Sequence, residues 1–478
     1  MTAPAPALRM GTAAGRGTLL AAILASGMVF LDTTVVNVAL PRLGAELKAS
    51  VADLQWTVNG YLLTLAAFVL LGGALGDRFG RRRVFLIGVA WFATASVLCG
   101  LAQGTGWLIV ARFLQGAGGA LLTPGSLSVL QASFHRDDRG RAIGTWSGLS
   151  GVSTALGPLL GGWLIDALSW RWIFFINLPL AVAVVLAALR WVPESRDVAA
   201  SRTGATRRFD VGGALLGALG LGGVTYALID APARGGRSPA VLVSVLVGVL
   251  AVAAFVLVER RRGEAAMLPT KLFGSRLFSV LNVFTVVVYA ALGGFTFFLA
   301  VFLQNGIGWS ALRTGLATVP MTLLLLVGSP RAGALSAKIG PRLPLTVGPV
   351  IAAGGLLLLR RIGPGASYWV DVLPGVVLFG AGLTLVVAPL TTSVLAAVAD
   401  RFAGVASGFN NAASRAGGLL AVAALPLLVG LSGTGYEQKA ALTDAFRGAL
   451  LWCAGLLLLG AVLAGLLVHR PGKGRTPS

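Results

Sequence analysis

Residues 73–83 read GALGDRFGRRR and separate two long apolar runs, 56–75 and 84–102. Glycines let a chain reverse direction and let helices approach one another closely. We expect Asp77 at the start of the following helix, where a carboxylate suits the positive end of the helix dipole. Arg81 and the two arginines after it suit an anionic lipid surface. This short basic connection therefore predicts two membrane-spanning helices joined on one side of a bilayer.

The same alternation of apolar runs and short polar connections continues along the chain. Of its 478 residues, 56% are hydrophobic and only 12% are charged, with a mean hydropathy of +0.85. A soluble domain carries about 25% charged residues, and a helix that spans a bilayer needs about 20 apolar ones. The composition excludes a soluble enzyme and predicts an all-α polytopic membrane protein with 14 transmembrane helices. The expected spans are 18–40, 56–75, 84–102, 107–128, 142–165, 173–191, 211–229, 240–258, 278–303, 315–335, 344–360, 372–390, 404–430 and 447–468.

The net charge of +21 comes from lysines and arginines concentrated in alternate connections. Basic residues mark cytoplasmic connections, so this pattern predicts a multi-pass protein of the cell (plasma or inner) membrane with both termini in the cytoplasm. Because the charge lies in short clusters between apolar runs, we expect a lipid bilayer and no nucleic acid as partner. Cys99 and Cys453 lie inside apolar runs and are expected to be lipid-facing or packed as small hydrophobes, with no metal site.

The two longest cytoplasmic connections divide the expected helices into groups of six, two and six. Residues 1–192 are predicted to form an N-terminal six-helix bundle, and 193–277 a central two-helix hairpin with flanking cytoplasmic loops. Residues 278–478 are predicted to form a C-terminal six-helix bundle and cytoplasmic tail. Transporters are commonly built from such paired repeats around a site at the bilayer midplane.

Two charged residues are expected deep inside the membrane, at the same depth. Asp32 lies in the first span and Arg112 in the fourth, and the rise per residue places both about 21–22 Å from the cytoplasmic side. Charged groups at such a depth are functional candidates by default. Desolvation favours the protonated form of a carboxyl group, so Asp32 can bind a proton. The alternative is a permanent structural ion pair with Arg112.

Several short motifs together resemble the major facilitator superfamily, and within it the fourteen-helix drug:proton antiporters. They are the loop 73–83, LDTTVVNVALP at 31–41, GPLLGG at 157–162 and WRWIFFINLP at 170–179. The resemblance implies a gating role for Gly73, Gly76, Asp77, Arg78, Gly80 and Arg81. It makes Gly157, Pro158, Gly161 and Gly162 the antiporter motif, to which Gly144, Gly148 and Gly151 add a stripe of small packing residues. Ser153 departs from the usual glycine, and a second copy of the loop, Gly333 to Arg342, lacks the aspartate.

The predicted function is a proton-coupled efflux transporter, or antiporter, that exports drugs or antibiotics by alternating access. Asp32 and Arg112 are the proton-coupling residues, the proton gradient supplies the energy, and no cofactor is expected. The residues expected to line the substrate cavity are Asn37, Tyr61, Gln115, Asn411 and Arg415. With one intramembrane acid against two bases, Arg112 and Arg415, neutral or weakly anionic lipophilic small molecules are expected over dications.

Two other functions compete with this one. A dedicated exporter of a single endogenous metabolite or self-made antibiotic would have the same sequence features. A membrane enzyme or receptor would need clustered polar residues within the spans or a sizeable soluble domain, and the sequence offers neither. No oligomeric state follows from the sequence.

Overall fold

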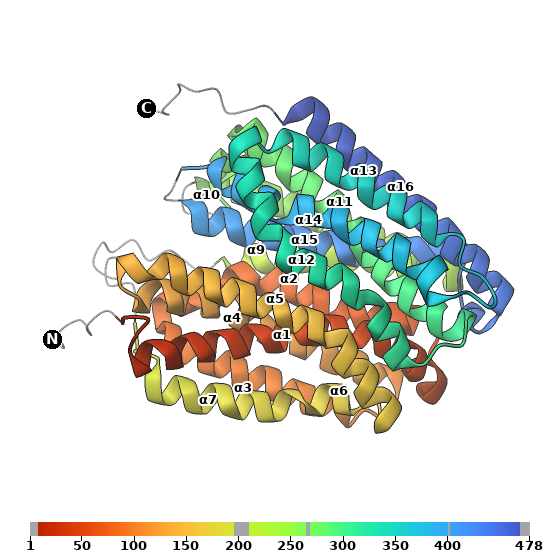
Figure 1. Ribbon diagram of the computed structural model, residues 1–478, viewed down its shortest axis with the longest axis horizontal. Helices are drawn as coiled ribbons and strands as arrows, with labels where there is room; N and C mark the ends of the chain where they lie inside the picture. The colour runs from red at the N-terminus through yellow and green to blue at the C-terminus, as the bar shows by residue number, and fades with distance from the viewer. Residues whose placement is uncertain (1–7, 196–209, 264–267, 400–401, 469–478) are drawn as a thin grey trace.

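A computed structural model of the protein describes residues 8–195, 210–263, 268–399 and 402–468 (Figure 1). It confirms an all-α fold: no strand is formed in these ranges, and only an isolated bridge joins Leu8 to Phe134. We call the helices up to residue 191 the N-terminal bundle. Its elements are α1 (Ala13–Leu47), α2 (Val51–Phe79), α3 (Arg81–Gly100), α4 (Thr105–Ser133), α5 (Arg136–Ala167), α6 (Trp172–Phe175) and α7 (Asn177–Trp191).

Two helices follow as a hairpin, α9 (Val211–Arg234) and α10 (Pro239–Arg262), and the remaining helices form what we call the C-terminal bundle. Most of the predicted basic linker between α7 and α9 lies outside the described residues. The elements of the C-terminal bundle, with the short turns that lead into them, are η2 (Thr270–Gly274), α11 (Arg276–Val301), η3 (Phe302–Gly306), α12 (Ala311–Ile339), α13 (Arg342–Leu359), η4 (Tyr368–Val372), α14 (Leu373–Ala396), α15 (Ala403–Leu428), η6 (Gly435–Glu437) and α16 (Lys439–Leu467).

Each expected span corresponds to one long helix, with α6 and α7 together forming the sixth. Thirteen of them are long and apolar enough to cross a membrane. The remaining one, α4, has 29 residues and packs against α2 and α3. It carries Arg112, Gln115 and several glycines, which lower its hydropathy. Its deficit in apolar residues thus coincides with the buried polar groups described below.

The connection at 73–83 folds as a tight turn, with one difference from the expectation. Gly80 has a φ of +109°, which only glycine adopts readily, and it separates α2 from α3. Asp77 was expected at the start of the second helix, but it lies in the last turn of α2. From there Asp77 forms an ion pair of 2.8 Å with Arg81, the first residue of α3. The acid therefore closes the turn through a side chain and not through the helix dipole.

The two bundles are joined most tightly at the end of the molecule away from both termini. We call this the distal end, and the end with the 73–83 turn the basic end. Tyr436 donates to the carbonyl of Ala49, and Val51 N donates to the carbonyl of Gly433. Figure 1 shows α5 and α12 meeting at the distal end and diverging toward the basic end. The hairpin helix α9 packs against α2 and α15 and so touches both bundles.

Candidate functional site

The centre of the N-terminal bundle holds a buried ion pair between α1 and α4. Arg112 Nη1 lies 2.6 Å from Asp32 Oδ2, and each side chain is only 1% exposed. A buried carboxylate and a buried guanidinium are each strongly disfavoured alone, so each requires the other. The sequence prediction that the two charges share one depth agrees with this contact.

Gln115 forms hydrogen bonds to both members of this pair. Its Nε2 donates to Asp32 Oδ1 at 2.7 Å, while its Oε1 accepts from Arg112 Nη1 at 2.6 Å. Because Gln115 lies one helical turn after Arg112, both side chains reach α1 from the same face of α4. Gln115 was expected in the substrate cavity, but the structure places it fully buried inside the N-terminal bundle.

The guanidinium of Arg112 is also held from α2. Its Nε donates to the carbonyl of Thr57 at 3.0 Å, and its Cζ lies 4.3 Å from the centre of the Tyr61 ring. A cation over an aromatic face is stabilised further where water is excluded. Tyr61 is itself fully buried. Asn37, expected beside it in the cavity, is half-buried on α1 and donates to the carbonyl of Thr33 at 3.3 Å.

The C-terminal bundle contributes a cation at the interface between the bundles. Arg415 of α15 is half-buried, and α15 packs both against α11 of its own bundle and against α2 of the N-terminal bundle. Among the described residues we find no hydrogen bond or ion pair to Arg415. Asn411, one turn earlier, is also half-buried. Its neighbour Asn410 instead bonds Asn282 and Thr285 of α11, at 3.1 and 2.7 Å.

The predicted gating loop is tied to the end of the N-terminal bundle. Arg82 N donates to Glu194 Oε1 at 3.2 Å, and Arg81 N donates to the carbonyl of Ser195 at 3.0 Å. A side chain at Gly80 would collide with Glu194. Gly73 and Gly76 lie in the last two turns of α2, and the guanidinium of Arg78 lies 5.5 Å from the centre of the Phe79 ring. Two hydrogen bonds therefore hold the loop to the segment that follows α7.

Glycines of the 157–162 motif bring α5 against two helices at once. A Cβ at Gly157 would overlap Thr34 of α1, and one at Gly162 would lie 2.6 Å from the backbone of α12. Gly161 faces Val35, and Gly315 of α12 rests on the carbonyl of Pro158. The motif thus forms the distal contact between the bundles. Asp166 adds to this contact by accepting from Leu312 N at 2.8 Å.

The small-residue stripe nearer the basic end does not pack. A Cβ at Gly144, Gly148 or Gly151 would meet no atom within 4 Å. The expectation that these glycines allow close packing is therefore wrong for this conformation. The reason is the divergence of α5 from α12 toward the basic end, which leaves this face of α5 uncovered although the helix still packs against α1.

Comparison with known proteins agrees with this architecture. The family profile described as Major Facilitator Superfamily matches residues 22–422. The chain belongs to the major facilitator superfamily. It is a transporter and not an enzyme, and it resides in a membrane.

Its relatives are resistance and export proteins. It is 38% identical over 412 residues to the Tetracenomycin C resistance and export protein of Streptomyces glaucescens, covering 86% of this chain and 75% of that one. It is 36% identical over 468 residues to the Puromycin resistance protein pur8 of Streptomyces alboniger, covering 94% and 90%. Among solved structures, a bacterial homologue of the human lysosomal transporter Spinster, in an inward-facing and unoccupied conformation, matches with a TM-score of 0.66. At 19% identity, over 96% of this chain and 97% of that one, it shows the fold alone.

Sequence reasoning missed part of the polar centre of this transporter. Ser96 of α3 and Asn177 of α7 extend the network beyond Gln115. Cys99, expected as a simple small hydrophobe, lies with its Sγ 3.5 Å from Gln115 Oε1. Single small polar residues in apolar runs carry little signal, because their partners lie on helices distant in sequence. Asn177 stands within WRWIFFINLP, and that motif was the one available hint.

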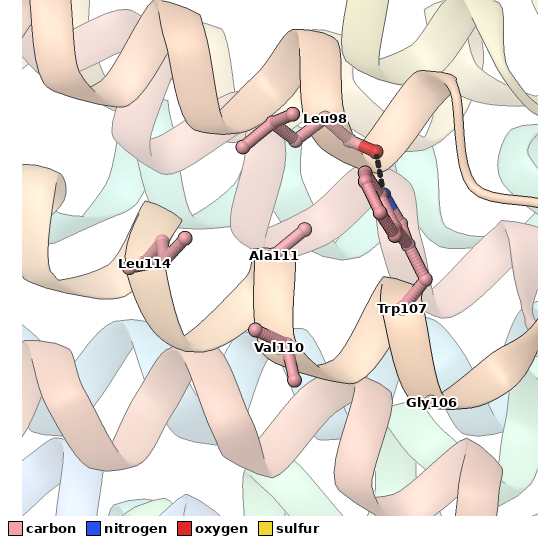
Figure 2. Close-up of a pocket in the computed structure, with 6 residues that line it drawn as sticks. All are labelled: Leu98, Gly106, Trp107, Val110, Ala111 and Leu114. Carbon is pink, nitrogen blue, oxygen red and sulfur yellow. Dashed lines mark hydrogen bonds between the residues drawn. The ribbon is translucent and has the colours of Figure 1, made fainter.

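A shallow apolar pocket of the transporter lies away from this centre. It has a volume of about 390 Å³ and lies between α3 and α4, where Trp107 Nε1 donates to the carbonyl of Leu98 at 2.8 Å (Figure 2). Its lining is apolar, and Val110 is 60% exposed. Such a surface suits lipid chains in a membrane. Within the described residues, no group of His, Cys, Asp and Glu is arranged to hold a metal ion.

Proposed function

We propose that this transporter is a proton-coupled antiporter that exports drugs or antibiotics across the cell membrane by alternating access. The observation that carries the proposal is the pairing of Asp32 with Arg112, both 1% exposed, in the middle of a membrane-spanning bundle. Asp32 is an acid, and it needs no cofactor to bind and release a proton. The names of its relatives, which refer to antibiotic resistance and export, support the direction of transport.

The proposed cycle uses the two ends of the bundle in turn. The described conformation is held closed at the distal end, and we assign the basic end, with both termini, to the cytoplasm because positive charge favours that side. When the distal end opens, Asp32 takes up a proton from outside and its pairing with Arg112 weakens. When the basic end opens, the proton is released and the pair forms again. Each proton that moves inward releases about 2.3 kcal/mol of free energy per 100 mV of membrane potential.

The proposed substrates are lipophilic and either neutral or weakly anionic. Arg415 places a positive charge at the interface between the bundles without a carboxylate beside it, so a dication would meet repulsion there and an anionic group would meet attraction. The competing proposal is a dedicated exporter of one endogenous metabolite or self-made antibiotic. The names of several relatives, each tied to a single antibiotic, favour that narrower function.

Transport into inverted membrane vesicles tests the proposal. Puromycin, methylenomycin A and a panel of unrelated lipophilic compounds would be assayed with and without an imposed pH gradient. We expect gradient-driven uptake that Asp32→Asn abolishes, since asparagine has nearly the shape of aspartate and keeps one oxygen that can accept from Arg112, but it binds no proton. Asp444→Asn is the matched control, because Asp444 is an exposed acid on α16. Full gradient-driven transport by Asp32→Asn would refute proton coupling, and uptake of one compound alone would select the dedicated exporter.

A further inference from the structure

Two buried polar side chains lead from the ion pair away from the interface between the bundles. Gln115 Nε2 donates not only to Asp32 but also to Ser96 Oγ of α3, at 2.7 Å. Asn177 Nδ2, at the first residue of α7, donates to the same Ser96 Oγ at 3.1 Å. Gln115, Ser96 and Asn177 are each at most 1% exposed. The network therefore joins α1, α4, α3 and α7 out of contact with water.

This arrangement uses every polar position of the Gln115 amide. One N–H points to Asp32, the other to Ser96, and the oxygen accepts from Arg112. Turning the amide over would direct its N–H groups at the guanidinium, which is itself a donor. It would also remove the hydrogen bond that Gln115 now gives to Asp32. Since a buried donor without an acceptor is costly, Ser96 holds the amide in its present orientation, and Asn177 in turn holds Ser96.

The orientation of Gln115 matters because it favours one protonation state of Asp32. A hydrogen bond donated to a carboxylate stabilises its charged form. A proton on Asp32 Oδ1 would oppose the N–H of Gln115, so protonation there must displace this amide. We propose that Ser96 and Asn177 are positioning residues that fix Gln115 on the carboxylate of Asp32 and so set the pH at which the transporter takes up its proton. This inference rests on the proposed proton coupling through Asp32.

A titration of the purified full-length transporter by infrared difference spectroscopy tests the inference. The carboxyl band of Asp32 is identified as the band lost in Asp32→Asn, and its midpoint is then measured as a function of pH. In Ser96→Ala the Gln115 amide loses its anchor and its bond to Asp32 weakens. We expect the midpoint to rise by about 0.5–1 pH unit, the range that follows from the net worth of one hydrogen bond.

Two further variants separate positioning from a general structural effect. Asn177→Ala should raise the midpoint by less than Ser96→Ala, and the double variant should match Ser96→Ala, because Asn177 acts through Ser96. Ser126→Ala is the matched control: Ser126 is a buried serine of α4 that bonds only the carbonyl of Leu122 in its own helix. Its midpoint should equal that of the wild type.

The possible outcomes distinguish failure of the positioning role from failure of the proposed proton coupling through Asp32. If no band lost in Asp32→Asn titrates in the wild type, the proposed proton coupling fails. If the band titrates but its midpoint is unchanged or lowered in Ser96→Ala, the positioning role is overturned while proton coupling stands. An equal rise in Ser126→Ala would also overturn it, since any lost buried hydroxyl would then have the same effect.

Discussion

Gln55 of α2 supplies a hydrogen bond that Pro426 removes from α15. Proline has no N–H, so Pro426 leaves the carbonyl of Val422, four residues earlier, without its helical donor. The Nε2 of Gln55 lies 2.7 Å from that carbonyl oxygen and 3.0 Å from that of Ala423. Gln55 is 2% exposed. The unpaired carbonyl of one bundle is thus satisfied by a side chain of the other, across the closed distal end.

Removing this bond should favour the conformation that opens at the distal end. In Gln55→Leu the Val422 carbonyl stays buried without a donor in the closed state, at a cost of about 1–3 kcal/mol. Spin labels would be placed at Leu168 and Lys439, which are both exposed at the distal end. Double electron–electron resonance would then show a larger share of long distances between the two labels.

The matched background for this prediction is Pro426→Ala, in which the backbone N–H of residue 426 can again donate to the carbonyl of Val422. In that background Gln55→Leu should shift the distance distribution much less, giving a clear interaction in the double-mutant cycle. Equal shifts with and without Pro426 would show that Gln55 does not act through this carbonyl.

Glycines at the α5–α12 contact should be indispensable for closing the distal end. In Gly315→Ala the new methyl group would overlap the Pro158 carbonyl, which is backbone and cannot move aside as a flexible side chain would. We expect less than about a tenth of wild-type transport and a population held open at the distal end. Gly455→Ala is the matched control, since Gly455 is an exposed glycine of α16 and a Cβ there meets nothing within 4 Å. Comparable loss in both variants would contradict the role of this contact.

The sequence predicted the fold and the shared depth of Asp32 and Arg112, because both follow from the cost of polar groups in lipid. Apolar runs determine the helices, and the rise per residue places Asp32 and Arg112 at one depth. The tertiary partners of this pair could not be predicted from the sequence. Ser96 and Asn177 became part of the site only once α3 and α7 were packed against α4, and the role of Gln55 depends on a proline 371 residues later in another bundle.

Conformation accounts for the other differences. The stripe of Gly144, Gly148 and Gly151 has the spacing of a packed helix face, yet it lies uncovered, because spacing does not reveal which end of an alternating-access transporter is open. Asp77 was assigned to the wrong helix because the boundary between two helices depends on one residue with positive φ, Gly80. Local patterns place such boundaries only to within a few residues.

Removing Arg112 should destabilise the transporter more than removing the whole ion pair. In Arg112→Leu the carboxylate of Asp32 stays buried without its counter-ion, and we expect the free energy of unfolding to fall by about 3–5 kcal/mol. The double variant Asp32→Asn with Arg112→Leu should recover part of that loss. The apparent Tm in detergent, compared across the two single variants and the double, checks this. A double variant less stable than Arg112→Leu alone would show that the pair is not a mutually dependent unit.

Arg415 should discriminate between substrates by charge. It is half-buried on α15, which packs against α2 of the other bundle, and no described carboxylate forms an ion pair with it. A hydrogen bond to a charged group contributes about 1.5–3 kcal/mol, so Arg415→Gln should reduce export of a carboxylate compound about tenfold or more while sparing its methyl ester. Arg237→Gln, at an exposed arginine of the α9–α10 connection, should affect neither. The check is resistance and vesicle transport with matched acid and ester pairs, together with a divalent quaternary ammonium compound. Equal losses for acid and ester, or better resistance to the dication than to either, would remove Arg415 from substrate selection.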